Sequence, residues 1–282
     1  MPFSIRPAPL FRPYWPWILP GLVLLLLQGV WAKHPEWVEQ YYSRGIFPYI
    51  RFALDHLFGW LPLPVFYLLV PGLIIWLLFR IVRTIRTPGL RWDRKLGHLG
   101  LGTVSVGLTL ILAFQLLWGL NYQRSPLEQL LGLTTAPLNQ EQTFEELQSA
   151  TRELLETRRL LVADSLAFPL DEPNFQEVKA NVEQTLQTFF QKHHLPHHYQ
   201  PPARRLHPKG ILLRISTAGF YMPLTGECNL DAGLHPLQVP FVLAHEYGHG
   251  YGFGPEDACN FLAWVSCREA TAPLVRYAGL LG

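Results

Sequence analysis

The chain has 282 residues, of which 49% are hydrophobic and only 16% are charged. An average soluble domain carries roughly 25% charged residues, so the composition argues against a plain soluble enzyme, a disordered tail and a nucleic-acid binder. Residues 1–120 hold 11 Lys and Arg against 4 Asp and Glu, and residues 121–282 hold 12 against 17. The two parts therefore carry net charges of +7 and −5, which sum to the +2 of the chain. A membrane part joined to an aqueous part explains this asymmetry.

Three long apolar runs, at residues 15–32, 57–79 and 99–120, contain no charged residue. Each is long enough to cross a hydrocarbon core of about 30 Å as a helix. Tryptophans, which favour the membrane interface, lie near the ends of the runs: Trp15, Trp17, Trp31, Trp60 and Trp118. We therefore predict an α-helical membrane anchor of three transmembrane helices over residues 1–120.

The first run has one alternative, a cleaved signal peptide, because Arg6 and Arg12 precede it. Its exit at residues 29–33 lacks a small-x-small cleavage pattern, which favours an uncleaved span. The loop after the second run is strongly basic, with six Lys or Arg between residues 80 and 95 and the single acid Asp93. Basic loops stay on the cytoplasmic side. The N-terminus is then cytoplasmic as well, and residues after about 121 face outward.

The second half is ordinary in composition and predicts a mainly helical α+β domain over residues 121–282. Thr143 and Glu146 form a capping-box pattern before a helix that runs to Leu161. A second helix is predicted to begin near Pro173. The branched run at residues 211–217 predicts a strand, and residues 220–231 predict a second strand or an ordered loop.

The chemistry is concentrated in the pattern His245-Glu246-Tyr247-Gly248-His249, which follows the helix-opening Pro240. Residues i and i+4 share one face of a helix, so both imidazoles can reach the same metal ion. Zinc accepts such ligands and leaves one position for water in a catalytic site. Zinc also lowers the pKa of that water to about 7, and Glu246 is placed to take its proton.

A third ligand is expected from Glu256, seven residues after His249. The glycines of residues 250–254 permit a sharp turn, and Pro255 suits the start of a new helix. A helix–turn–helix would bring the Glu256 carboxylate back over the two imidazoles. Asn260 lies one turn further on the same face, where it can hydrogen-bond a ligating histidine and fix its ring.

The Glu-x-x-x-Asn step after the paired histidines resembles the gluzincin clan of metallopeptidases. More narrowly, the chain looks like an uncharacterised bacterial family of multi-span membrane proteins with a gluzincin-like domain. Three stretches carry this resemblance: Trp-Gly-x-Asn-Tyr-x-Arg at 118–124, Thr-Gly-Glu-x-Asn at 225–229, and the paired-His and Glu-Asn-Phe pattern of 245–261. The resemblance implies a zincin-like fold, His245, His249 and Glu256 as metal ligands, and Glu246 as general base.

The chain departs from that family at a few positions. Cys228 and Cys259 stand where the family usually has Ala, and Ala258 stands where it often has an acid. A disulfide between Cys228 and Cys259 and two buried free thiols both remain open. The family tends to continue beyond the position of Gly282, so a domain that is incomplete at its C-terminus is one expectation.

Other polar residues give weaker signals. Tyr221 can donate to the oxyanion of a tetrahedral intermediate, although a lone tyrosine after a strand more often has a packing role. Glu227 either lines the cleft or pairs with a basic residue. Pro196 interrupts the histidines at 193, 194, 197 and 198, and a solvated loop is favoured there over a second metal site.

These patterns predict a membrane-anchored zinc metallopeptidase with one Zn²⁺ per chain and a peptide or protein substrate. We expect it in the bacterial cytoplasmic membrane, with the lipid bilayer as its surroundings and no nucleic-acid partner; the oligomeric state is open. Peptide binding along the 211–217 strand is one expectation. Two alternatives remain: a catalytically inactive metal-binding membrane module with a regulatory or structural role, and an intramembrane protease.

Overall fold

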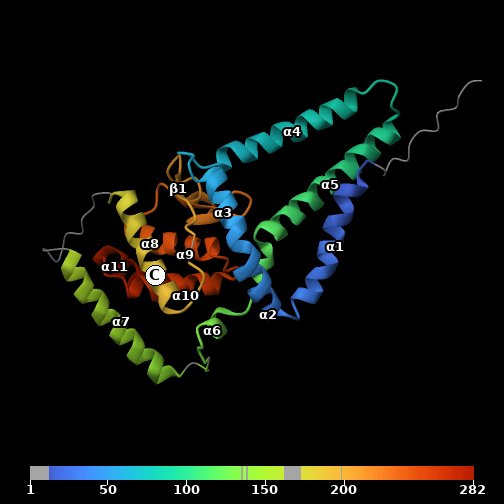
Figure 1. Ribbon diagram of the computed structural model, residues 1–282. Helices are drawn as coiled ribbons and strands as arrows, with labels where there is room; N and C mark the ends of the chain where they lie inside the picture. Colours follow the sequence, from blue (N-terminus) through green and yellow to red (C-terminus); the bar gives the residue numbers. More distant parts are fainter. Residues whose placement is uncertain (1–12, 135, 138, 162–172, 198) are drawn as a thin grey trace, which may run out of the picture.

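The computed structural model describes residues 13–134, 136–137, 139–161, 173–197 and 199–282. It is mainly helical, with one small sheet. In Figure 1 the helices α1, α4 and α5 extend to one side of the molecule, and α8 to α11 gather with the strands on the other. The signal-peptide alternative rests partly on Arg6 and Arg12, which lie outside the described residues.

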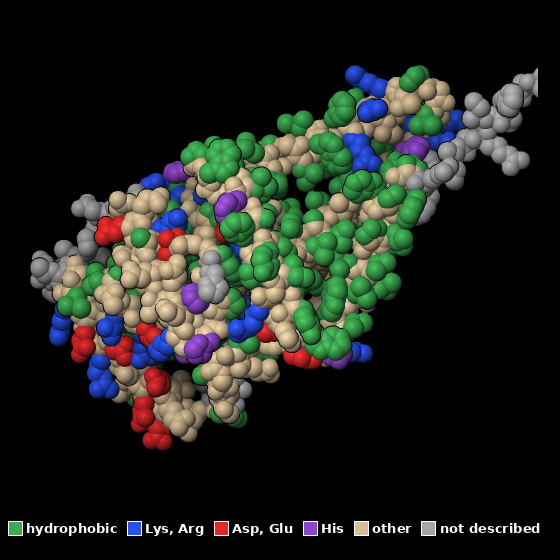
Figure 2. Space-filling view, viewed as in Figure 1, with side chains coloured by type: hydrophobic (Ala, Val, Ile, Leu, Met, Phe, Trp, Pro, Cys, Tyr) green, Lys and Arg blue, Asp and Glu red, His purple; other side chains and the backbone are tan. Residues whose placement is uncertain are grey.

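The extended side contains α1 (Trp15–Trp31), α4 (Phe66–Arg86) and α5 (Trp92–Leu117). Two helices, α4 and α5, are long and apolar enough to cross a membrane, and α1 adds a third candidate only together with the bent segment Pro35–Phe58. Hydrophobic side chains cover this side, whereas Lys and Arg gather at its far end (Figure 2). Helix α4 buries none of its residues, so its apolar surface is available to lipid.

The helix boundaries differ from the predicted runs of 57–79 and 99–120. Residues 59–65 are not helical, because Gly59, Pro62 and Pro64 interrupt the run before α4 begins. Helices α4 and α5 instead extend into the charged residues that flank their runs, up to Arg86 in α4 and from Trp92 in α5. Backbone hydrogen bonding continues through these residues because long basic side chains reach water from a helix end.

The segment between the first two runs is helical and packs into the main core. It forms α2 (Pro35–Trp37), a π-helix η1 (Val38–Ile46) and α3 (Phe47–Phe58). Val38, Tyr42 and Phe47 belong to the same cluster of buried residues as Leu243 and Leu262 near the paired histidines. Residues 35–58, which lie between α1 and α4, therefore contribute directly to the core of the second half.

The second half begins with short elements and two long helices: η2 (Gly119–Gln123), α6 (Leu127–Leu130), α7 (Gln140–Leu161) and α8 (Phe175–Lys192). Asn139, rather than Thr143, accepts a hydrogen bond from the second residue of α7, so the predicted capping box is wrong. Asn174 caps α8 in the same way, one residue after Pro173. Side chains of Asn suit this position because their oxygen satisfies a free N–H of the first turn.

The sheet has the order β1–β3–β2, with β1 (Ala203–Leu206) parallel and β2 (Gly219–Met222) antiparallel to the central β3 (Glu227–Asp231). The predicted strand at 211–217 is wrong, since this segment contains the 3₁₀ turn η3 (Leu213–Ile215). The carboxylate of Asp231 accepts hydrogen bonds from the N–H groups of Gly210, Leu212 and Leu213. These bonds replace the ladder that a strand needs. Ser216 then adopts a left-handed conformation with φ 57°.

The chain ends with α9 (Val239–Gly250), α10 (Glu256–Arg268) and α11 (Pro273–Leu281), which pack on one another and on the sheet. Prolines occupy the first turns of α9 and α11, as expected for residues that lack an N–H. Cys228, Cys259 and Cys267 are buried and free. Cys228 donates to the carbonyl of Glu246, and Cys259 to that of Phe253.

Glu227 answers one question left open by the sequence, because it pairs with a basic residue. It is fully buried, with Arg204 Nε 2.5 Å and the Thr225 hydroxyl 2.9 Å from its carboxylate. The backbone N–H of Val65, just before α4, also donates to it. Glu227 of the Thr-Gly-Glu stretch thus links the sheet to the start of α4 through the N–H of Val65.

We predict that Glu227→Ala lowers the free energy of unfolding by about 3–5 kcal/mol, because it leaves Arg204 buried without its partner. Chemical denaturation in detergent, followed by tryptophan fluorescence, measures this change. Glu269→Ala is the matched control, since Glu269 pairs with Lys192 at the surface and its loss costs less than about 1 kcal/mol. Equal effects of the two substitutions would contradict the role assigned to Glu227.

Candidate metal centre

The structure brings His245, His249 and Glu256 together. Both histidines lie on one face of α9, and Glu256 is the first residue of α10. Nε2 of His245 lies 3.1 Å from one carboxylate oxygen of Glu256, and Nε2 of His249 lies 3.5 Å from the other. One ligand atom from each residue falls within 4.8 Å of the others, and no other such group occurs among the described residues.

The second nitrogen of each imidazole is already occupied. Nδ1 of His245 lies 2.8 Å from Oδ1 of Asn260, and Nδ1 of His249 lies 2.9 Å from the carbonyl oxygen of Phe253. Both partners are acceptors, so each Nδ1 carries the proton and each Nε2 presents a lone pair toward Glu256. Burial and the neighbouring His249 lower the pKa of His245, which further favours the neutral ring. Two neutral imidazoles and a carboxylate form a donor set that zinc accepts in catalytic sites.

Glu246 lies beside this triad in a nearly dry position. Its side chain is 4% exposed, and its Oε2 atom has no hydrogen-bond partner among the described residues. Burial, and then the negative charge of Glu256, raise the pKa of Glu246 to about 8. A divalent cation held by the triad would oppose this shift, because it favours the charged carboxylate. An unpartnered buried oxygen at this point fits a residue that exchanges protons with a group in the cleft.

A cleft of about 580 Å³ opens over the triad. Its walls are α9, the residues around β2, and the end of α5 with the turn that follows it. The residues from that last wall are Phe114, Trp118 and Tyr122. Tyr221 also lines the cleft, but its hydroxyl accepts a hydrogen bond from Arg51 Nη1 at 2.8 Å. Burial raises the pKa of Tyr221 to about 12, so the hydroxyl keeps its own proton for donation.

The turn that returns the chain from α9 to α10 is held by the stretch at 118–124. The indole N–H of Trp118 donates to the carbonyl of His249 at 2.7 Å, and Arg124 Nη1 donates to the carbonyl of Gly252 at 2.9 Å. Gly252 has a φ of +85°, and a Cβ atom there would lie 2.9 Å from Phe47 and 3.0 Å from Asn121. The glycine permits both the turn and the close packing of this stretch against it.

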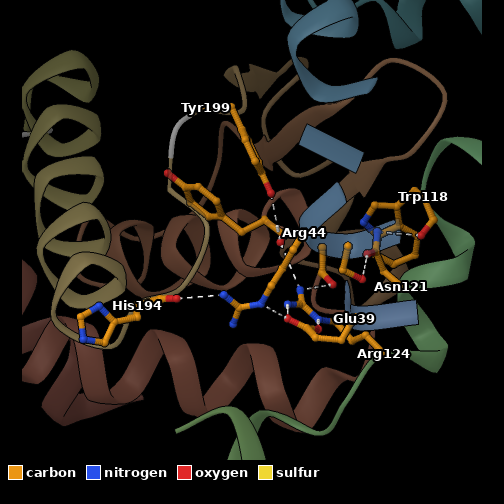
Figure 3. Close-up of polar contacts among 10 residues, drawn as sticks. Glu39, Arg44, Trp118, Asn121, Arg124, His194 and Tyr199 are labelled. Carbon is orange, nitrogen blue, oxygen red and sulfur yellow. Dashed lines mark hydrogen bonds and ion pairs between the residues drawn. The ribbon is translucent and has the colours of Figure 1, made fainter. Parts of the chain in front are cut away.

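Arg124 also makes the central ion pair of this region (Figure 3). Its guanidinium donates twice to Glu39, at 2.7 and 2.9 Å, and lies over the ring of Phe253. Arg44 donates to the same carboxylate at 2.7 Å and to the carbonyl of His194. Two cations around one buried acid form a connected network, which compensates for removing these charges from water.

Sequence reasoning missed several of these positioning residues. No motif in the sequence singles out Glu39, Arg44 or Arg51, yet Arg51 is fully buried and bonded to Asp55 and to the carbonyl of Gly226. A charged residue within an amphipathic helix, flanked by apolar residues such as Ile50 and Leu54, is a signal of burial. The histidines at 193, 194 and 197 form no metal site in the described part of the chain, and residue 198 lies outside it.

Comparisons with known proteins place the chain in a family. Residues 42–282 match the model of a family described as "Protein of unknown function (DUF3810)", and the chain belongs to that family. Neither the curated proteins nor the solved structures contain a match. The matched region begins within η1 and includes the Arg51 contacts, the 118–124 stretch and the His245, His249 and Glu256 triad. The family is uncharacterised, so it assigns no activity.

We predict that Asn260→Ala lowers zinc affinity about 10- to 100-fold, because the His245 ring loses the acceptor that orients it. Competition with a chromophoric chelator measures this loss on the purified protein. Asn260→Asp keeps an acceptor at the same place and is expected to stay much closer to the unmodified protein. Equal zinc affinity in the Ala variant and the unmodified protein would contradict the positioning role.

We further predict that Arg124→Met weakens zinc binding although Arg124 does not contact the triad. The substitution frees the Gly252 carbonyl and leaves Glu39 with Arg44 alone, which loosens the α9–α10 turn. The same chelator competition measures the loss, and thermal unfolding is expected to shift downward with it. Arg152→Met is the control, because Arg152 is exposed on α7 and bonds within its own helix. A loss of stability with unchanged zinc affinity would contradict the link to the metal centre.

Proposed function

We propose that this protein is a membrane-anchored zinc metallopeptidase of the gluzincin-like type, which hydrolyses peptide bonds in the cleft above α9. The observation that carries the proposal is the convergence of His245, His249 and Glu256 beside the buried, unpartnered oxygen of Glu246. The resemblance of residues 245–261 to gluzincin metallopeptidases supports the same assignment. The proposed cofactor is one Zn²⁺ per chain.

Zinc held by the triad would polarise the substrate carbonyl and make water in the cleft more acidic. Glu246 takes the proton from the attacking water and returns it to the leaving amine. Its buried position supports this role, since a carboxylate surrounded by protein binds a proton more readily than one in water. Asn260 and the Phe253 carbonyl keep the two imidazoles in the required tautomer throughout.

The substrate is proposed to bind in extended form along β2 (Gly219–Met222). This strand borders the cleft, and β3 is its one strand neighbour among the described residues. Strand addition at such an edge uses main-chain hydrogen bonds and imposes little sequence preference. The 211–217 segment is not proposed to bind the peptide, because the N–H groups of Leu212 and Leu213 already donate to the carboxylate of Asp231.

The anchor is proposed to insert α4, α5 and the bent α1 region into the bilayer, with the basic α4–α5 end cytoplasmic. Helix α5 supports this orientation. It begins at Trp92 within the basic segment and ends at Leu117, beside the cleft. Its 26 residues span about 39 Å, which is long enough to separate the triad from the basic end by a hydrocarbon core of about 30 Å. Helix α9 has only 12 residues and packs against α10 and the sheet, which disfavours an intramembrane protease.

We predict that Glu246→Gln lowers the rate of peptide hydrolysis about 10²- to 10⁴-fold while zinc stays near one per chain. The amide cannot accept the proton of water but fills the same space. Cleavage of a quenched-fluorescent peptide library and elemental analysis of the purified protein give the two readouts. His245→Ala is the companion variant and is expected to lose zinc and activity together.

Three outcomes of these measurements distinguish the peptidase from the alternative functions. Loss of hydrolysis in Glu246→Gln with zinc retained supports the peptidase. Zinc binding without hydrolysis by the unmodified protein would favour an inactive metal-binding membrane module. A purified protein that binds no zinc would overturn both, and replacement by another divalent ion would change only the identity of the cofactor.

A further inference from the structure

A second cavity lies between α1, α4 and α5, on the membrane side of the molecule and away from the metal triad. Its volume is about 1060 Å³, and most of its lining is apolar. The charged side chains in its wall are basic, Arg80 and Arg83 of α4, and no Asp or Glu lines it among the described residues. The cavity therefore combines a positive end with an apolar interior.

Arg80 is held in this cavity by neutral contacts. Its guanidinium carbon lies 5.4 Å from the ring centre of Trp76 and 5.8 Å from that of Tyr14. Helix α5 leaves room for it at Gly102, where a Cβ atom would come within 2.8 Å of Nη2. The ring faces attract the cation weakly but do not neutralise it. No ion pair joins Arg80 or Arg83 to an acid in the part of the chain that the structure describes.

Four of the hydroxyl groups in the lining, those of Tyr14, Thr84, Thr87 and Thr109, already form hydrogen bonds. Thr84 and Thr87 donate to carbonyls of their own helix, and so does Thr109. The Tyr14 hydroxyl bonds to His98 at the start of α5. The charged donors that face the cavity are those of the two arginines, and they have no acidic partner among the described residues. A ligand that satisfied them would need to be an anion with several acceptor oxygens.

The position of Arg80 along α4 indicates where that anion lies in a bilayer. Arg80 precedes the last residue of the helix, Arg86, by six positions, which is about 9 Å along the axis. This depth corresponds to the boundary between the hydrocarbon core and the headgroups. An ionisable residue at such a depth faces a partner or a polar cavity, and here it faces a cavity that continues as apolar surface.

We propose that this cavity binds one anionic phospholipid, with its phosphate against Arg80 and Arg83. The acyl chains lie along the apolar lining residues of the three helices: Trp17, Leu73, Trp76, Val106 and Leu110. The lipid would fill the space between α4 and α5 and supply the negative charge that the described residues lack there. The site depends on membrane insertion of these helices but not on the metal centre.

Native mass spectrometry of the full chain in detergent tests the proposal, with phosphatidylglycerol and phosphatidylcholine as the two probes. We expect one phosphatidylglycerol per chain, bound about tenfold tighter than phosphatidylcholine. Arg80→Gln combined with Arg83→Gln is expected to abolish this preference. Arg91→Gln is the matched control, because Arg91 is 84% exposed, pairs with Asp93 and lies outside the cavity.

A charge-keeping pair, Arg80→Lys with Arg83→Lys, separates loss of binding from loss of folding and is expected to retain the preference for phosphatidylglycerol. The proposal is overturned if the unmodified protein binds both lipids equally, or if the glutamine pair keeps the preference. Displacement of the lipid by millimolar inorganic phosphate would also overturn it, because the site would then bind free anions. Zinc content and peptide hydrolysis test the metal centre separately. A failure of the proposed peptidase function would therefore be distinguishable from a failure of the proposed lipid site.

Discussion

The turn between α9 and α10 is the constraint on which the candidate metal centre depends. Glu256 faces the two histidines only because the chain reverses within residues 251–255, and such a reversal leaves carbonyls without helical partners. Trp118 satisfies the carbonyl of His249, and Arg124 that of Gly252. Both side chains follow directly after α5, and Arg124 is held in turn by Glu39 from the segment before α3. The turn that positions Glu256 is therefore held by residues far from it in sequence: Trp118 and Arg124 after α5, and Glu39 before α3.

The local parts of the site could be predicted from the sequence. The spacing of His245 and His249 fixes their common helical face, and the glycines before Pro255 fix where the next helix begins. Asn260 follows Glu256 by one turn, and this spacing alone predicts that it lies near the ring of a paired histidine, as it does at His245. These inferences rest on helix geometry and turn chemistry over fewer than about twenty residues, the range in which sequence spacing determines distance.

Contacts between distant segments could not be predicted in this way. The 211–217 run has the composition of a strand, yet a carboxylate from Asp231 takes its N–H groups and folds it into a turn. The apolar runs predict that α4 and α5 exist. They do not predict where these helices begin and end, because the charged residues beside a run can continue its helix. The burial of Arg51 and Glu39 could not be predicted for the same reason, because their partners Gly226 and Arg124 lie 175 and 85 positions away.

The participation of residues 38–58 and 118–124 in the core of the second half has a consequence for how the molecule can be released from its membrane. Phe47 packs in the same cluster as Leu243, and Trp118 closes one wall of the cleft. A proteolytic cut just after α5 would place the triad on a different fragment from the buried Glu39 and Arg51. Such a fragment would lack Phe47, Glu39 and Arg51 from its core, so the activity proposed here would require the intact chain.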